Sequence, residues 1–142
     1  MDDYQSISFY ALRTGPDFNF FNILKMKILI IINDPPYGTE KLYNAMRLTH
    51  QLVKDHPEIE LRVFLMADAA TAALTNQVTP NGYYNVERML KLALSKGVKI
   101  KICGSCAEAR GINKLPLIEG TELSNMSELA HWVVDSDKVL TF

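Results

Sequence analysis

The stretch Lys27-Ile28-Leu29-Ile30-Ile31-Ile32 decides the fold of this chain. It is almost purely aliphatic and β-branched, which is typical of a strand covered on both faces inside a parallel sheet. We therefore predict a central strand here. A turn follows at 33–38, and Thr39 is predicted to cap a helix whose apolar residues recur at steps of three and four until His56-Pro57 ends it.

Strands and helices continue to alternate along the rest of the chain. Four further strands are expected, at 60–66, 98–102, 115–123 and 139–142, the third of them short and weak because Gly120 lies inside it. Asp68 is predicted to cap a short helix over 69–74, and Thr75 to Gly82 reads as a loop.

Two longer helices complete the pattern. The first begins near Asn85 and stops at Gly97, with Glu87 and Lys91 paired one turn apart. The second opens with a capping box of Asn125 and Glu128 and runs through Val134. Its buried stripe is predicted to be Met126, Leu129, Ala130 and Val133, with Trp132 off the stripe, in a subunit interface or at the edge of the core.

This order predicts an α/β fold, a three-layer α/β/α domain with a mainly parallel five-stranded sheet, because parallel neighbours need right-handed crossovers. The carboxyl ends of parallel strands meet at one edge of the sheet, where such folds bind ligands. We therefore expect three loops to converge there, at 33–39, 66–68 and 103–106.

Composition excludes several classes of protein. The 142 residues suit one domain, predicted at 26–142, and 15 basic against 16 acidic residues leave no electrostatic footprint for nucleic acid. No apolar stretch reaches the roughly 18 residues of a membrane span. Two cysteines do not make a secreted disulfide framework, so we expect a reducing cytoplasm.

The first 25 residues differ from the rest, since they sustain neither a helical nor a strand period. They do not resemble a secretory signal, because Met1-Asp2-Asp3 is not basic and Asn19 and Asn22 interrupt the apolar run 18–24. We interpret 1–25 as an N-terminal extension. Two hypotheses stay open for it, a mobile arm and a start site placed too far upstream.

Both cysteines lie where a strand pattern gives way to a helical one, in Ile100-Lys101-Ile102-Cys103-Gly104-Ser105-Cys106-Ala107-Glu108-Ala109-Arg110-Gly111. The amides of 104–106 can point at the Cys103 sulfur and stabilise its thiolate, which makes Cys103 the preferred nucleophile. Cys106 has three open roles: resolving thiol, second sulfur acceptor, or buried filler. The remaining alternative is that neither cysteine is reactive and that both are small hydrophobic residues buried for packing.

Other residues are candidates for ligand binding or for support of the thiols. Each also has a purely structural interpretation, as turn residue, helix cap, helix stop or solvated charge. They are Asn33, Tyr37, Gly38, Asp68, Gly104, Ser105 and Arg110. No metal is expected, because His50, His56 and His131 lack a paired ligand spacing, and the glycine-poor loops predict no phosphate-bound cofactor.

Four motifs, taken together at their spacing, resemble the DsrE/DsrF-like family, closest to its YchN-like branch, over Met26 to Phe142. They are Ile31-Ile32-Asn33-Asp34-Pro35-Pro36-Tyr37-Gly38-Thr39-Glu40, Phe64-Leu65-Met66-Ala67-Asp68-Ala69, Lys101-Ile102-Cys103-Gly104-Ser105-Cys106 with Arg110-Gly111-Ile112, and Asp137-Lys138-Val139-Leu140-Thr141-Phe142.

The resemblance implies a homo-oligomer, commonly a homohexamer. In sulfur-relay members the carrier cysteine, which holds a persulfide, lies seven residues before the Arg of an Arg-Gly pair; here that cysteine is Cys103. Cys106 is not part of the minimal relay pattern, although YchN-like members have it.

Three functions therefore stay open. The first is a sulfurtransferase or sulfur carrier that exchanges sulfane sulfur with donor and acceptor proteins through Cys103. The second is a dithiol redox protein that uses Cys103 and Cys106. The third is a non-catalytic oligomer that binds a small molecule or a protein.

Overall fold

The structure is a computed structural model that describes residues 25–142. The predicted N-terminal extension therefore lies outside the described residues, except for Lys25, and its nature stays a prediction. Within the described part of the chain, no helix combines the length and the apolar character that crossing a membrane requires.

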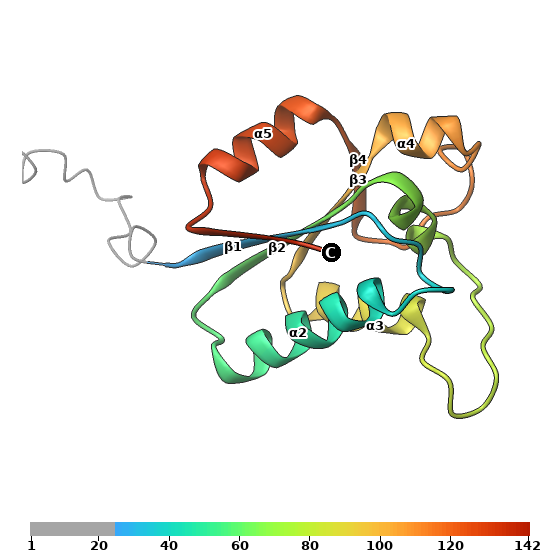
Figure 1. Cartoon of the computed structure of the whole chain (residues 1–142), viewed down its shortest axis with the longest axis horizontal. Coiled ribbons are helices and arrows are strands. Elements are labelled where there is room, and N and C mark those ends of the chain that lie inside the picture. Colours follow the sequence, from blue (N-terminus) through green and yellow to red (C-terminus); the bar gives the residue numbers. More distant parts are fainter. Residues whose placement is uncertain (1–24) are drawn as a thin grey trace, which may run out of the picture.

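A five-stranded sheet of order β4-β3-β2-β1-β5 forms the centre of the fold (Figure 1). All four neighbouring pairs are parallel, and the sequence expectation of an α/β fold with a mainly parallel sheet is confirmed. The strands are β1 (Lys27–Ile32), β2 (Glu60–Leu65), β3 (Lys99–Cys103), β4 (Thr121–Ser124) and β5 (Lys138–Thr141).

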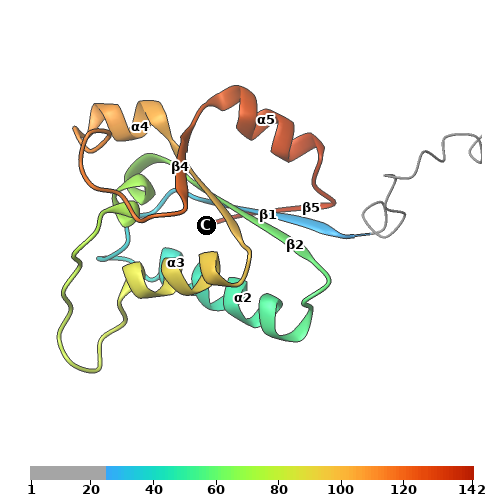
Figure 2. The same cartoon turned by 180° about the vertical axis from the view of Figure 1, so that it is seen from behind.

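Helices cover both faces of the sheet, as Figures 1 and 2 show from opposite sides. The helices α2 (Lys41–Asp55) and α3 (Val86–Ser95) lie on one face, and α5 (Met126–Val134) lies on the other. Two short helices, the 3-10 helix η1 (Ala67–Ala73) and α4 (Gly104–Ala109), directly follow β2 and β3 at the carboxyl edge of the sheet.

The alternation of side chains along each strand divides the core into two parts. Ile28, Ile30 and Ile32 of β1 pack on the side of α2 and α3, whereas Leu29 packs on the side of α5 with Phe64. Burial of each such aliphatic or aromatic side chain stabilises the fold by about 1.5–3 kcal/mol. Both faces of β1 are thus covered, as its unbroken apolar sequence predicts.

One of the three predicted helix caps is correct, because Asn125 accepts a hydrogen bond from the Glu128 N–H. Asn85, near which the sequence predicts the start of a helix, also caps its helix by accepting from the Arg88 N–H. Thr39 is not a cap, because its hydroxyl donates to the Asp34 carboxylate and α2 begins after Glu40.

The predicted cap Asp68 is also wrong. This residue lies inside η1, which Met66 precedes without a side-chain cap. Its carboxylate instead accepts hydrogen bonds from the guanidinium of Arg110. The two residues are far apart in the sequence, so a local pattern could not predict this contact.

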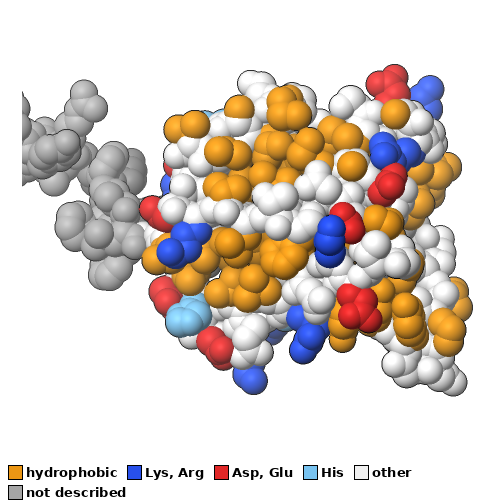
Figure 3. All heavy atoms as spheres, in the orientation of Figure 1, with side chains coloured by type: hydrophobic (Ala, Val, Ile, Leu, Met, Phe, Trp, Pro, Cys, Tyr) orange, Lys and Arg blue, Asp and Glu red, His pale blue; other side chains and the backbone are white. Residues whose placement is uncertain are grey.

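The predicted buried stripe of α5 is largely wrong. Leu129 and Trp132 are the buried residues, and Trp132 packs edge-on against Phe64 in the core. Met126, Ala130 and Val133 are exposed. Apolar side chains therefore gather on the outer surface over α5 (Figure 3).

A network of charges lies beneath α5. The buried Arg62 side chain donates to Glu60 and to Asp135, and Lys27 donates to Asp135 at 2.9 Å. The hydrogen bonds from Lys27 and Arg62 outweigh the opposing effect of burial and lower the pKa of Asp135 to about 2. Asp135 directly follows α5, so this network ties the end of the helix to β1 and β2.

Replacement of Asp135 by Asn should destabilise the fold at neutral pH by about 1 kcal/mol, after allowance for solvent screening at a partly exposed carboxylate. The folded-state pKa is lowered, so the carboxylate's contribution is complete above its unfolded pKa of 3.8 and is lost as the pH falls through about 2. Urea unfolding of the wild type and of Asp135→Asn, at neutral pH and at pH 2, measures the difference between their free energies of unfolding. The exposed Glu119→Gln is the control, and a difference between wild type and Asp135→Asn that is as large at pH 2 as at neutral pH would contradict the assignment.

Candidate functional site: the thiol pair at the sheet edge

The register of the sheet places the site. Ile32 pairs with Leu65, and Leu65 pairs with Ile102. The residues that follow these three are Asn33, Met66 and Cys103, so they form the next row at the carboxyl edge. The predicted convergence of three loops at this edge is confirmed.

Cys103 ends β3 and is the N-cap of α4. Its Sγ accepts a hydrogen bond from the Cys106 N–H at 3.4 Å, and the Ser105 hydroxyl lies 3.3 Å away. Burial alone would raise the pKa of Cys103. Hydrogen bonds from the Cys106 thiol, from Ser105 and from the backbone outweigh that effect and lower the pKa below its ordinary value.

Cys106 lies one helical turn further on and is half-buried. Its Sγ accepts a hydrogen bond from the Ala67 N–H at 3.2 Å. Burial and the hydrogen bond to Cys103 raise the pKa of Cys106, although the Ala67 N–H opposes the rise. When the pair loses one proton, these opposite shifts place the thiolate on Cys103 and leave the proton on Cys106.

Ala67 holds an uncommon backbone conformation, with φ at +47°. A non-glycine residue in the left-handed region carries strain of order 1–3 kcal/mol, and such residues cluster at functional sites. Sequence reasoning missed Ala67, because alanine carries no mark of a positive φ. The one available signal is its place directly after a buried strand.

Gly104 permits β4 to lie against the thiol turn. A Cβ on Gly104 would meet the Ser124 carbonyl oxygen at 2.9 Å, which is closer than real Cβ contacts allow. Gly104 has no positive φ, so this close approach, and not turn conformation, explains the glycine.

Arg110 and Asp68 form an ion pair beside the thiols. The Arg110 guanidinium donates twice to Asp68 Oδ1, at 2.9 and 2.8 Å, and donates to the Cys106 carbonyl at 3.1 Å. The Arg110 charge is therefore shared with Asp68. Arg110 ends α4, and Gly111 follows with φ at +67°, as expected of a helix stop.

The predicted site residues of the first loop do not all lie beside the thiols. Asn33 lies at the edge, where its N–H donates to the Phe142 carbonyl at 2.8 Å. Tyr37 lies away from the thiols: its hydroxyl donates to Gln77 and accepts from the Val86 N–H, and its ring stacks on Tyr84. Gly38 has φ at +99° with open space around it, which fits turn chemistry.

The other predicted site residues lie close together. Cys103, Gly104, Ser105 and Cys106 form the turn at the start of α4, and the Asp68–Arg110 ion pair lies beside it. Among residues 25–142, no group of three or more His, Cys, Asp or Glu side chains is arranged to hold a metal ion. The arrangement can hold a thiolate, accept sulfur on it, or form a disulfide between the two cysteines.

The sequence profile of the DsrE/DsrF-like family matches residues 26–142, which includes the whole of this sheet and both cysteines. The chain belongs to the DsrE/DsrF-like family. The resemblance seen in the sequence is thereby confirmed.

The chain is similar to two named proteins and to one solved structure. Protein YchN of Escherichia coli (strain K12) is 45% identical over 116 residues, covering 82% of this chain and 98% of that protein. The crystal structure of the E. coli ychN protein matches with a TM-score of 0.79 at 44% identity, covering 82% of this chain and 99% of that chain. Sulfurtransferase TusD of Salmonella dublin is 28% identical over 128 residues, covering 82% of this chain and all of that protein.

The Cys103 thiol should ionise below the pH at which a free cysteine does. In the wild-type chain, iodoacetamide labelling of Cys103, followed on its own by peptide mass spectrometry, should have a midpoint below the ordinary thiol pKa, because the donors favour the thiolate. Adding Ser105→Ala should raise that midpoint, since one donor is lost. The same midpoint with and without Ser105 would show that its hydroxyl does not stabilise the thiolate.

Gly104→Ala should destabilise the fold by about 1–3 kcal/mol, because the added methyl group overlaps the Ser124 carbonyl. A loss of stability would be informative, because replacing a glycine inside a helix by alanine usually stabilises the protein by about 0.5–1 kcal/mol. Urea unfolding measures the effect, with Ser105→Ala as the neighbouring control. A stabilised Gly104→Ala variant would contradict the close approach of β4.

Proposed function

We propose that this chain is a sulfur carrier in which Cys103 accepts sulfane sulfur as a persulfide and passes it on. The observation that carries the proposal is the set of donors aimed at the Cys103 sulfur, the Cys106 N–H and the Ser105 hydroxyl. The 28% identity to a protein named as a sulfurtransferase supports the same chemistry.

The proposed step is a nucleophilic exchange. The Cys103 thiolate attacks the terminal sulfur of a donor persulfide, a bond forms between Sγ and that sulfur, and the donor's S–S bond breaks. The donor leaves as a thiolate. The new terminal sulfur stays on Cys103, with the proton it carried, until an acceptor thiolate attacks it in the same way.

Access to the sulfur is the main structural requirement of this proposal. Cys103 is 5% exposed and packs in the cluster that contains Phe64 and Trp132. A donor can therefore reach Sγ only after neighbouring side chains shift. Ser105 is exposed and lies beside Sγ, and its side chain is the nearest polar group that can turn aside.

Treatment with inorganic polysulfide should add the mass of one sulfur atom to the peptide that contains Cys103, measured by mass spectrometry under non-reducing conditions. Cys103→Ser should abolish the addition. Cys106→Ser should keep it, because Cys106 has the raised pKa and is the less reactive thiol. Addition to Cys106 alone, or to neither cysteine, would contradict the proposal.

A dithiol redox role is the second candidate. The spacing of the cysteines favours it, because Cys106 lies one helical turn after Cys103 and its backbone N–H already donates to the Cys103 sulfur. A disulfide that forms under mild oxidant, in a protein that takes up no sulfur from polysulfide, would favour this function over sulfur transfer.

We also propose that copies of the chain associate, up to the hexamer that the family resemblance implies, and that donor and acceptor proteins meet the assembly in a reducing cytoplasm. The exposed apolar residues of α5, Met126, Val133 and Val134, support association, because large apolar patches on a protein surface mark contact sites. Light scattering of the purified protein measures the assembly directly.

A further inference from the structure

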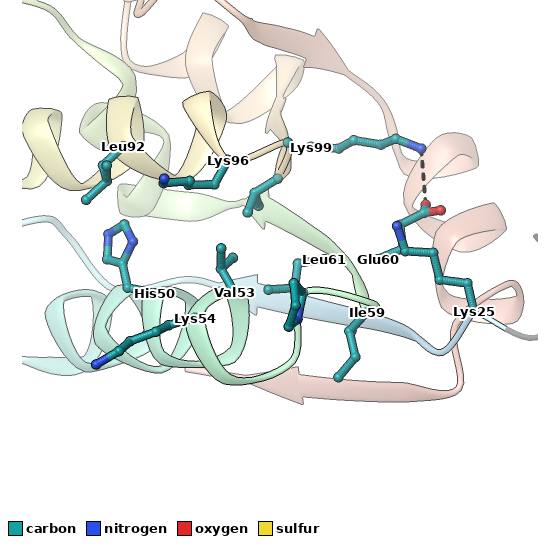
Figure 4. Close-up of a pocket in the computed structure, with 13 residues that line it drawn as sticks. Lys25, His50, Val53, Lys54, Ile59, Glu60, Leu61, Leu92, Lys96 and Lys99 are labelled. Atoms are coloured by element: carbon teal, nitrogen blue, oxygen red, sulfur yellow. Dashed lines mark hydrogen bonds and ion pairs between the residues drawn. The ribbon is translucent and has the colours of Figure 1, made fainter.

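A cavity of about 800 Å³ opens at the edge of the sheet opposite the thiols. It lies between the C-terminal parts of α2 and α3 and reaches the amino ends of β2 and β3 (Figure 4). Sites for small molecules in proteins have volumes of about 300–1,000 Å³. The cavity is large enough for a ligand, and the sulfur chemistry does not use it.

The walls of the cavity offer apolar surface. Val53 of α2, Leu92 of α3, and Ile59 and Leu61 at the start of β2 line it. Leu92 is 50% exposed, which leaves a large aliphatic side chain in contact with solvent inside a concave surface. An apolar group placed here would remove this surface from water at about 25 cal/mol per Å² buried.

Positive charge surrounds this apolar surface. Four lysines line the cavity, Lys25, Lys54, Lys96 and Lys99, against the carboxylate of Glu60. Glu60 already accepts from Lys99 at 3.1 Å and from Arg62 at 2.8 Å. The charges of Lys54 and Lys96, on the two facing helices, are therefore not balanced by Glu60.

His50 adds a buried polar nitrogen to the cavity. Its Nε2 is buried and forms no hydrogen bond with the residues that the structure describes. Figure 4 shows its ring between the two helices, facing Leu92 and the side chain of Lys96. A buried polar atom without a hydrogen bond costs about 1–3 kcal/mol, so a ligand that supplied one would recover part of that cost.

Lysines also suit the ends of helices, where they complement the negative end of the helix dipole. Lys54 lies in the last turn of α2, and Lys96 is the C-cap of α3. That explanation accounts for the two charges. It does not account for the uncovered apolar wall or for the unpartnered nitrogen of His50.

We propose that this cavity binds a small organic anion with an apolar body, of the class of aliphatic carboxylates. The aliphatic chain packs against Val53 and Leu92. The carboxylate lies between Lys54 and Lys96, within reach of His50. This site is separate from the thiol pair, and its test does not depend on sulfur transfer.

Three probes test the proposal on the full chain by calorimetry and by amide chemical-shift mapping. Octanoate carries both features of the ligand, octanamide lacks the charge, and acetate lacks the apolar chain. Octanoate should bind saturably and shift the amides of Val53, Leu92, Gly97 and Val98. Octanamide and acetate should each bind at least about fivefold more weakly.

Matched lysine variants separate the site from general charge. The double variant Lys54→Ala with Lys96→Ala should weaken octanoate binding about fivefold, because both exposed cations that face the carboxylate are lost. Lys41→Ala with Lys114→Ala removes the same charge outside the cavity lining and should leave binding unchanged. Equal effects of the two double variants, shifts centred on α5, or no saturable binding of octanoate would each overturn the proposal.

Discussion

The parallel register of β1, β2 and β3 is the constraint on which the rest of the structure depends. Backbone hydrogen bonds such as that from the Met66 N–H to the Ile32 carbonyl, at 2.8 Å, fix which residues share a row. A slip of one residue would turn Leu29 and Phe64 from one face to the other. Because both faces are covered, no such slip is tolerated, and Cys103 stays beside Met66.

The thiol pair takes its chemistry from this fixed arrangement. Cys103 receives its donors from the start of its own helix, whereas Cys106 receives one from Ala67, which the neighbouring strand brings. The pKa of Cys103 falls while that of Cys106 rises. The geometry thus distinguishes two thiols that are only three residues apart.

The sequence predicts what depends on local pattern. The apolar run of β1 identifies a doubly covered strand, and Asn85 and Asn125 cap their helices because the groups they bind lie three residues away. Asp68 and Thr39 fit the same cap pattern. Their side chains bind Arg110 and Asp34 instead, and only the folded chain brings Arg110 within reach of Asp68.

The misassigned face of α5 has a different cause. This helix is apolar on two sides, and a periodic pattern cannot say which side meets the sheet. Trp132 contacts Phe64 and lies over the cations of Arg62 and Lys101, so the sheet itself selects the buried side. Ala67 could not be found either, because its backbone angle is imposed by the chain around it.

Trp132 is the chain's one tryptophan, and it packs in the same cluster as Cys103. Its indole ring lies 4.8 Å from the Lys101 ammonium and 5.5 Å from the Arg62 guanidinium, measured to the ring centre. Tryptophan emission depends on nearby charge and is quenched by thiolates. The emission of the unlabelled protein, excited selectively at tryptophan, therefore comes from Trp132 alone. Its intensity depends both on the packing of α5 against the sheet and on the ionisation of the Cys103 thiol.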